Sequence, residues 1–162
     1  MYSLESVKRF LEKNRGNKKV VLIGGSFDIL HVYHLKILTE AKKLGDILIV
    51  GINSDKHIRK KKVKGRPIVP EKCRAEMVNA LKPVDLVFIT DISLYYPENI
   101  SAIKPDVFVF GKDKKRIAAR HNRVEWLKKE FPNMKVAFKG PLKFKISTSK
   151  IVQKCSEKLK GG

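Results

Sequence analysis

With 162 residues, 43% of them hydrophobic, the chain is long enough for one globular domain whose core needs neither disulfide bonds nor a structural metal. Its two cysteines, Cys73 and Cys155, match no metal-ligand spacing and follow no signal sequence, so we expect a reducing, cytoplasmic compartment. No apolar run approaches the roughly 20 residues that span a bilayer. The net charge of +20 predicts attraction to polyanions, a class that includes nucleotides, phosphorylated metabolites, RNA and anionic membranes.

Short apolar runs rich in Val, Ile and Phe alternate along the chain with helical patterns. In chain order, these patterns predict a helix at 4–11, a strand at 20–23, a helix at 35–44, a strand at 47–52, a helix at 71–81, a strand at 86–89, a helix at 97–103, a strand at 107–110, a helix at 117–131, a strand at 136–138 and a helix at 148–159. The alternation implies βαβ units, and therefore a Rossmann-like α/β fold with an open, parallel, five-stranded sheet and helices on both faces. We expect a helical extension at 1–19 and a single domain at 20–159.

The first predicted strand is followed by GGSFDILHVYH, residues 24–34. In open parallel sheets, ligands bind outside the carboxyl ends of the strands, where the strand order reverses. Gly24 and Gly25 would let the backbone turn tightly there and approach a ligand closely. The glycine patterns of dinucleotide-binding folds and of P-loops are both absent. Asp28 either caps the turn before the next helix or faces a metal.

His31 and His34 lie three residues apart within this stretch. If a helix begins here, its first amide groups are unpaired, its dipole favours an anion, and both imidazoles can donate to one phosphate. A metal site would need further ligands, which no second nearby cluster supplies. Two unrelated histidines are the third interpretation, and the residue types alone leave it open. His57 and His121 carry no motif, and we expect both at the surface.

Residues 24–38, GGSFDILHVYHLKIL, resemble the G-x-F-D-x-x-H-x-G-H motif of the cytidylyltransferase-like nucleotidyltransferase superfamily. This superfamily includes glycerol-3-phosphate and ethanolamine-phosphate cytidylyltransferases, the heptose adenylyltransferase domain, archaeal FAD synthases and phosphopantetheine adenylyltransferase. The resemblance continues, in order, through AKKLGDILIVGINSD (41–55), GRPIVPEKCRAEMVNALKPVD (65–85), KPDVFVFGKD (104–113) and ISTSKI (146–151). Ordered blocks over most of the chain are far more specific than one histidine pair.

The resemblance implies an enzyme that transfers a nucleotidyl group from the donor nucleoside triphosphate, CTP or ATP, to a small phosphorylated acceptor with release of pyrophosphate. It assigns His31 and His34 to the α- and β-phosphates and the transition state, with Lys36 helping on the acceptor side. Arg74 would contact the β- and γ-phosphates, unless it is only a surface arginine. Mg²⁺ would neutralise the polyphosphate, mostly through the oxygens of the substrate.

Further residues would contact the nucleotide by the same resemblance. Ser147 and Thr148, at a predicted helix start, would offer donors to the phosphates, although Ser147 also reads as a simple N-cap. The remaining positions are the backbone around Gly24, Gly25, Ser26 and Phe27, and Gly111 with Asp113 near the base or ribose.

Tyr33 occupies the position where the motif of the superfamily has glycine. Its ring can swing out and leave the site intact, reshape the base or acceptor pocket, or occlude the nucleotide. The last outcome, together with the net charge, motivates an alternative function: a nucleic-acid-binding or regulatory module with impaired catalysis, for which RNA is the partner. A homodimer is also open, since the superfamily is often dimeric.

Overall fold

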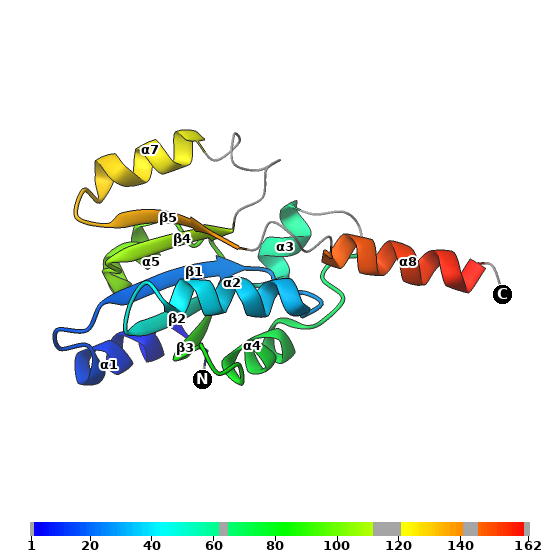
Figure 1. Cartoon of the computed structure of the whole chain (residues 1–162), viewed down its shortest axis with the longest axis horizontal. Coiled ribbons are helices and arrows are strands. Elements are labelled where there is room, and N and C mark those ends of the chain that lie inside the picture. Colours follow the sequence, from blue (N-terminus) through cyan, green and yellow to red (C-terminus); the bar gives the residue numbers. More distant parts are fainter. Residues whose placement is uncertain (1, 62–64, 112–120, 141–145, 161–162) are drawn as a thin grey trace.

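The computed structural model describes residues 2–61, 65–111, 121–140 and 146–160, and it is organised around a five-stranded parallel sheet (Figure 1). The strand order is β3-β2-β1-β4-β5. The strands are β1 (Val20–Gly25), β2 (Ile47–Asn53), β3 (Leu86–Thr90), β4 (Val107–Gly111) and β5 (Lys135–Lys139). Every predicted strand and the Rossmann-like α/β class are confirmed, with shifts only at the strand ends.

The central strand β1 is apolar on both faces because both faces are covered. Val20 and Leu22 belong to one buried cluster, whereas Val21 and Ile23 belong to the other. All four side chains are almost completely buried. This two-sided burial explains why the sequence of β1 shows an unbroken apolar run and no polar alternation.

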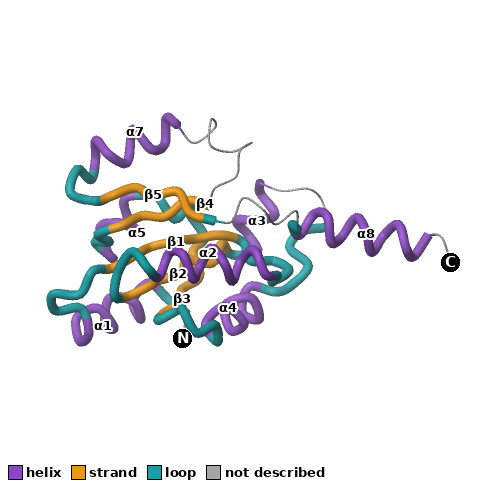
Figure 2. Tube along the Cα trace, in the orientation of Figure 1, coloured by secondary structure: helices purple, strands orange, loops and turns teal. Residues whose placement is uncertain are grey.

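Helices cover the two faces of the sheet (Figure 2). Residues of α2 and α4 pack on one face, and residues of α1, α5 and α7 pack on the other. The helices are α1 (Leu4–Asn14), α2 (Val32–Lys42), α3 (Asp55–Lys61), α4 (Glu71–Asn79), α5 (Pro97–Ile103), α7 (His121–Glu130) and α8 (Thr148–Lys160). Helix α2 begins three residues earlier than predicted, α3 was not predicted, and residues 117–120 of the helix predicted before β5 lie outside the described residues.

The N-terminal extension packs into the same core as the rest of the chain. Val7 and Leu11 of α1 lie in a buried cluster that includes Phe88 of β3. The backbone N–H of Ile89 also donates to the carbonyl oxygen of Tyr2 at 2.9 Å. The predicted helix in this extension is therefore confirmed, and it covers part of one face of the sheet.

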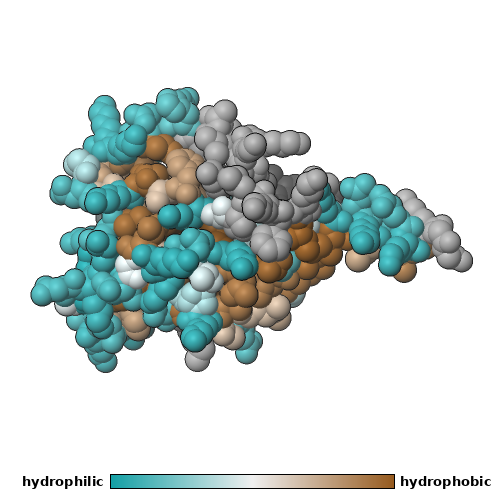
Figure 3. Space-filling view, in the orientation of Figure 1, coloured by the Kyte–Doolittle hydropathy of each residue, from teal (hydrophilic) through white to brown (hydrophobic). Residues whose placement is uncertain are grey.

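The strand order reverses direction at β1, because β2 follows it on one side and β4 lies on its other side. The carboxyl ends of the strands point toward the side from which α8 projects (Figure 1). Hydrophilic side chains cover much of α7 and the outer part of α8 on the viewed face (Figure 3). In the described parts of the chain, no helix has the length and apolarity to cross a membrane.

Candidate active site

Strand β1 ends with exposed backbone at Gly24 and continues through Gly25 into the connection to α2. A Cβ atom at this position would lie 2.9 Å from the carbonyl oxygen of Gly51 and 3.3 Å from Leu94 Cγ, so a side chain does not fit. The main chain at Gly24 is therefore free of a side chain, as predicted. Part of the reason that glycine is required here is the packing of Leu94 against it. Phe27 follows with a φ of 47°, which is uncommon for a residue with a side chain and is typical of constrained functional loops.

The histidine pair lies at the start of α2, as the spacing predicts. His31 is the N-cap residue and His34 is the third residue of the helix. The two rings stack, with their centroids 4.0 Å apart and an angle of 23° between the ring planes. The Nδ1 atom of His34 accepts a hydrogen bond from the backbone N–H of His31 at 3.3 Å, which leaves the proton of a neutral His34 on Nε2.

Burial lowers the pKa of His31 below its ordinary value of 6.5, because the charged imidazolium loses hydration. Two stacked imidazoles also disfavour double protonation, since like charges repel at this separation. An anion bound against the pair would reverse both effects. The pair is therefore suited to donate neutral hydrogen bonds or to become charged when a polyanion arrives.

Tyr33 is directed toward the end of β5. A Cβ atom at Gly140 would lie 2.8 Å from the Tyr33 hydroxyl oxygen and 3.3 Å from Tyr33 Cζ. The ring is partly buried against the cluster that contains Ile37 and Leu38 of α2. Gly140 has a φ of 135°, a conformation that favours glycine, so the residue opposite Tyr33 provides the space for its hydroxyl group. The ring thus fills the space between α2 and β5.

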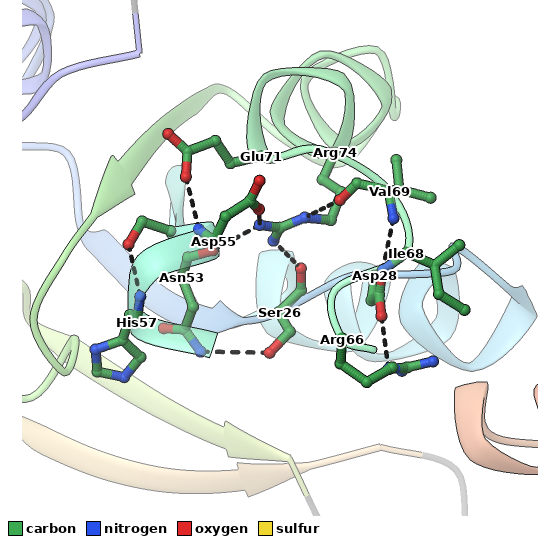
Figure 4. Close-up of polar contacts among 11 residues, drawn as sticks. Ser26, Asp28, Asn53, Asp55, His57, Arg66, Ile68, Val69, Glu71 and Arg74 are labelled. Atoms are coloured by element: carbon green, nitrogen blue, oxygen red, sulfur yellow. Dashed lines mark hydrogen bonds and ion pairs between the residues drawn. The ribbon is translucent and has the colours of Figure 1, made fainter. Parts of the chain in front are cut away.

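Asp28 fastens a second loop over the β1–α2 connection (Figure 4). Asp28 is 3% exposed, and its Oδ1 accepts hydrogen bonds from the backbone N–H groups of Ile68 at 2.7 Å and Val69 at 3.0 Å. Its Oδ2 lies 2.8 Å from Nε of Arg66 in an ion pair. The sequence offered two roles for Asp28, a cap of the turn or a metal-facing position. In the structure its carboxylate instead holds residues 66–69 against the β1–α2 loop.

Arg74 of α4 is buried, with 1% of its surface exposed. Its Nε donates to the Val69 carbonyl at 2.8 Å, and its Nη2 donates to the Asn53 carbonyl at 2.9 Å and to Asp55 Oδ1 at 2.7 Å. Its Nη1 donates to the carbonyl oxygen of Ser26 (Figure 4). These contacts use all three guanidinium nitrogens and join the two loops to the end of β2, so the alternative of a surface arginine was wrong, and the contact with β- and γ-phosphates stays a prediction. Sequence reasoning identified the residue but not its partners.

The other predicted site residues that the structure describes lie at the carboxyl side of the sheet. Lys36 is exposed on α2, and Gly111 ends β4, where an added Cβ atom would meet Ile37 Cδ1 at 3.2 Å.

The hydroxyl oxygen of Ser26 lies 3.5 Å from Asn53 Nδ2. Asp113 lies outside the described residues. Gly25 packs against the Phe27 ring, where a Cβ atom would lie 3.1 Å from Cε2.

The start of α8 has the predicted cap. Ser147 Oγ accepts a hydrogen bond from the backbone N–H of Lys150 at 3.3 Å, and Thr148 is the first helical residue. The N-cap interpretation of Ser147 is therefore confirmed, and its exposure leaves room for a second contact. Within the described residues, no group of three or more His, Cys, Asp or Glu side chains could hold a metal ion.

The two histidines outside the motif, His57 and His121, differ in their exposure to solvent. His57 is buried, and its Nδ1 donates to the carbonyl oxygen of Asp91 at 2.9 Å, so the expectation of a surface position was wrong. The unpredicted helix α3 places it there, and no sequence motif signals that contact. His121 is exposed at the start of α7, as expected.

Comparison with known proteins places these features in a family. The cytidylyltransferase-like family model matches residues 22–154. The bifunctional protein HldE of Campylobacter jejuni subsp. jejuni serotype O:2 is 41% identical over 160 residues, which cover 96% of this chain and 31% of that protein. HldE of Helicobacter acinonychis is 47% identical over 115 residues, or 68% of this chain and 23% of the relative. The chain thus spans less than a third of the length of these relatives.

Solved structures show the same likeness. The lipopolysaccharide core biosynthesis protein of Thermoplasma volcanium superposes with a TM-score of 0.62 at 30% identity, over 75% of this chain and 95% of that one. A protein from Archaeoglobus fulgidus has a TM-score of 0.55 at 22% identity, over 75% of this chain and 88% of that one, which is a likeness of fold alone. The matched residues include most of β1, all of β2 to β5 and the histidine pair. The chain belongs to the cytidylyltransferase-like family of nucleotidyltransferases, as the resemblance implied.

Proposed function

We propose that the chain transfers a nucleotidyl group from ATP or CTP to a small phosphorylated acceptor and releases pyrophosphate. The observation that carries this proposal is the stacked pair of His31 and His34 at the start of α2, next to exposed backbone at Gly24. Exposed main chain and a helix N-terminus together favour a phosphate group, because the amide groups and the helix dipole both attract anions. The strand order reverses at this point, where open sheets bind their ligands.

The reaction needs no protein nucleophile. A phosphate oxygen of the acceptor attacks the α-phosphorus in line, the bond from that phosphorus to the bridging oxygen breaks, and pyrophosphate leaves with the electron pair. Catalysis then rests on holding two anions together and on stabilising the charge that develops on the α-phosphoryl oxygens. His31 and His34 would donate hydrogen bonds to those oxygens, and Lys36 would lie on the acceptor side.

Donors from other elements would complete the phosphate site. Ser147 and Thr148 would contribute a hydroxyl or amide group from the first turn of α8. Mg²⁺, when bound, would neutralise the polyphosphate chiefly through the oxygens of the triphosphate. Arg74 and Asp28 would act indirectly, because they hold the loops on which the phosphate site is built.

The donor, the acceptor and the oligomeric state belong to the proposal as well. We infer ATP or CTP as donor from the family, and a sugar phosphate or another small phosphate ester as acceptor. A homodimer would be consistent with the superfamily. The alternative, an RNA-binding or regulatory module, is supported by the net charge of +20 and by no geometry within the described residues.

The test is pyrophosphate release with Mg²⁺, each triphosphate and a panel of sugar phosphates, glycerol 3-phosphate, alcohol phosphates and FMN. We expect turnover with one pair of substrates, and a loss of kcat of about 100-fold or more in His31→Gln and His34→Gln, the loss typical of removing one transition-state donor. His121→Gln is the matched control, because His121 is exposed on α7. No turnover with any pair, combined with no thermal stabilisation by either triphosphate, would refute the proposal.

A further inference from the structure

An aromatic pocket of about 530 Å³ lies apart from the histidine pair, between the start of α5 and the start of α7. Its volume is in the range of small-molecule sites. Three aromatic side chains and one proline share the lining with three polar side chains. The lining includes Tyr95, Tyr96, Glu98, Asn122, Arg123 and Trp126.

The rings of the pocket do not form two parallel walls. Tyr95 and Tyr96 meet edge to face, with an angle of 83° between their planes and centroids 5.4 Å apart. The guanidinium carbon of Arg123 lies 4.0 Å from the centroid of the Tyr95 ring and covers that face. Tyr96, which is 42% exposed, and Trp126 remain as the ring surfaces available to a ligand.

Polar groups stand beside these rings. Glu98 and Asn122 are exposed, and the side chain of neither makes a hydrogen bond or an ion pair with another described residue. A carboxylate accepts hydrogen bonds from hydroxyl groups, and a side-chain amide can both accept and donate. The pocket therefore combines apolar ring surface with separated hydrogen-bonding groups, and Arg123 adds positive charge.

The topology places the pocket at the same edge of the sheet as the histidine pair. Helix α5 follows the carboxyl end of β3 and α7 follows that of β4, so both helices start at this edge. Leu94, the neighbour of Tyr95, packs over the end of β1, where a Cβ atom at Gly24 would lie 3.3 Å from Leu94 Cγ. Helix α2 packs on one face of the sheet and α7 on the other. The histidine pair and the pocket thus flank the ends of β1 and β4 from opposite faces.

We propose that this pocket binds the ring of a sugar phosphate acceptor, the part of the acceptor that does not react. This inference rests on the proposed nucleotidyl transfer. A sugar ring has an apolar C–H face, which suits Tyr96 and Trp126, and a rim of hydroxyl groups, which suits Glu98 and Asn122. A flat aromatic acceptor would be held better by two parallel rings, and the edge-to-face tyrosines do not provide them.

Trp126 is the single tryptophan of the chain, so its fluorescence reports on the pocket directly. We would titrate the protein without nucleotide, using glucose 1-phosphate, mannose 1-phosphate, a heptose phosphate, glycerol 3-phosphate, FMN and inorganic phosphate. A saturable change with at least one sugar phosphate, and none with glycerol 3-phosphate or inorganic phosphate, is the expected result. A response to FMN alone, or to no compound, would overturn the inference.

Variants then separate the pocket from the phosphate site. Tyr96→Ala should raise the Kd and the KM for the sugar phosphate by about tenfold, the effect of losing one stacking contact. Glu98→Gln should raise both values in the same direction, and neither variant should change the KM for the triphosphate. Glu125→Gln is the control, because Glu125 is exposed on α7 and pairs with Lys128. An unchanged KM for the sugar phosphate in Tyr96→Ala would overturn the inference.

The two proposals fail in different ways. If sugar phosphates bind through Tyr96 but no acceptor yields pyrophosphate with either triphosphate, the proposed transfer is wrong and the pocket remains a sugar phosphate site. If pyrophosphate is released with an acceptor while Tyr96→Ala and Glu98→Gln leave both Kd and KM unchanged, the transfer stands and the pocket assignment is wrong.

Discussion

Replacing Arg74 separates its structural role from the predicted phosphate contact. In the structure its guanidinium donates to three carbonyl oxygens and to the Asp55 carboxylate, and it is 1% exposed. Arg74→Met removes all four hydrogen bonds and leaves a partly buried carboxylate without its partner. We expect a loss of about 3–5 kcal/mol in the free energy of unfolding, the usual cost of breaking a buried ion pair.

Arg74→Lys keeps the charge but replaces the planar fork with a single nitrogen atom. That nitrogen can stay with Asp55, yet it cannot reach all three carbonyl oxygens at once. With at least two carbonyls unpaired, at about 1 kcal/mol each, the loss should be roughly 2 kcal/mol. This variant keeps the experiment informative if Arg74→Met does not fold.

The assay is urea unfolding without nucleotide, followed by measurement of the KM for the triphosphate. Lys72→Met is the matched control, because Lys72 is exposed on the same helix and should leave the free energy of unfolding within about 0.5 kcal/mol of the wild-type value. If both Arg74 variants unfold at the wild-type urea concentration and lose only affinity for the triphosphate, Arg74 binds phosphate and the structural reasoning is refuted.

Four further substitutions test the loops, the Tyr33 contact and the histidine pair. Asp28→Asn should lower the free energy of unfolding by about 2 kcal/mol in urea, because Arg66 loses its ionic partner while the backbone acceptor remains; an unchanged value would contradict the anchoring role. Gly140→Ala should cost about 1–3 kcal/mol through its φ of 135° and its overlap with Tyr33, and Tyr33→Phe should recover only part of that loss in the double variant. Since the pKa of His31 is lowered in the fold, the unfolded chain binds more protons just below pH 6.5, and stability should fall as the pH drops from 6.5 toward the pKa of the folded state. His31→Gln should flatten that dependence in thermal melts at pH 5 to 8, and an identical pH profile would contradict it.

Much of the site could be predicted because its signals are local. The apolar runs of the strands are continuous in the sequence, and β1, β2 and β4 are buried on both faces, so the strand positions were predicted to within two residues at each end. The spacing of His31 and His34 and the start of α2 depend on one helical turn, and the structure brings the rings together as expected. The family resemblance, which depends on ordered motifs, is confirmed by the match over residues 22–154.

Other features depend on residues that are distant in the sequence. No local pattern distinguishes an exposed phosphate-binding arginine from a buried one, and only the fold places Ser26, Asn53 and Val69 around Arg74. The burial of His57 likewise depends on α3, a short charged helix whose sequence shows no apolar stripe.

Tyr33 shows which properties of the site follow from the sequence and which follow only from the tertiary structure. The sequence by itself determined that tyrosine replaces the glycine of the family motif between two histidines, and that the chain forms a parallel α/β sheet, because motif and hydrophobic pattern are local properties. Only the tertiary structure decided that the ring turns toward β5 and rests against Gly140, 107 positions further along the chain. The physical reason is packing: the direction of a side chain depends on the space that distant elements leave open, and that space exists only once the sheet is assembled.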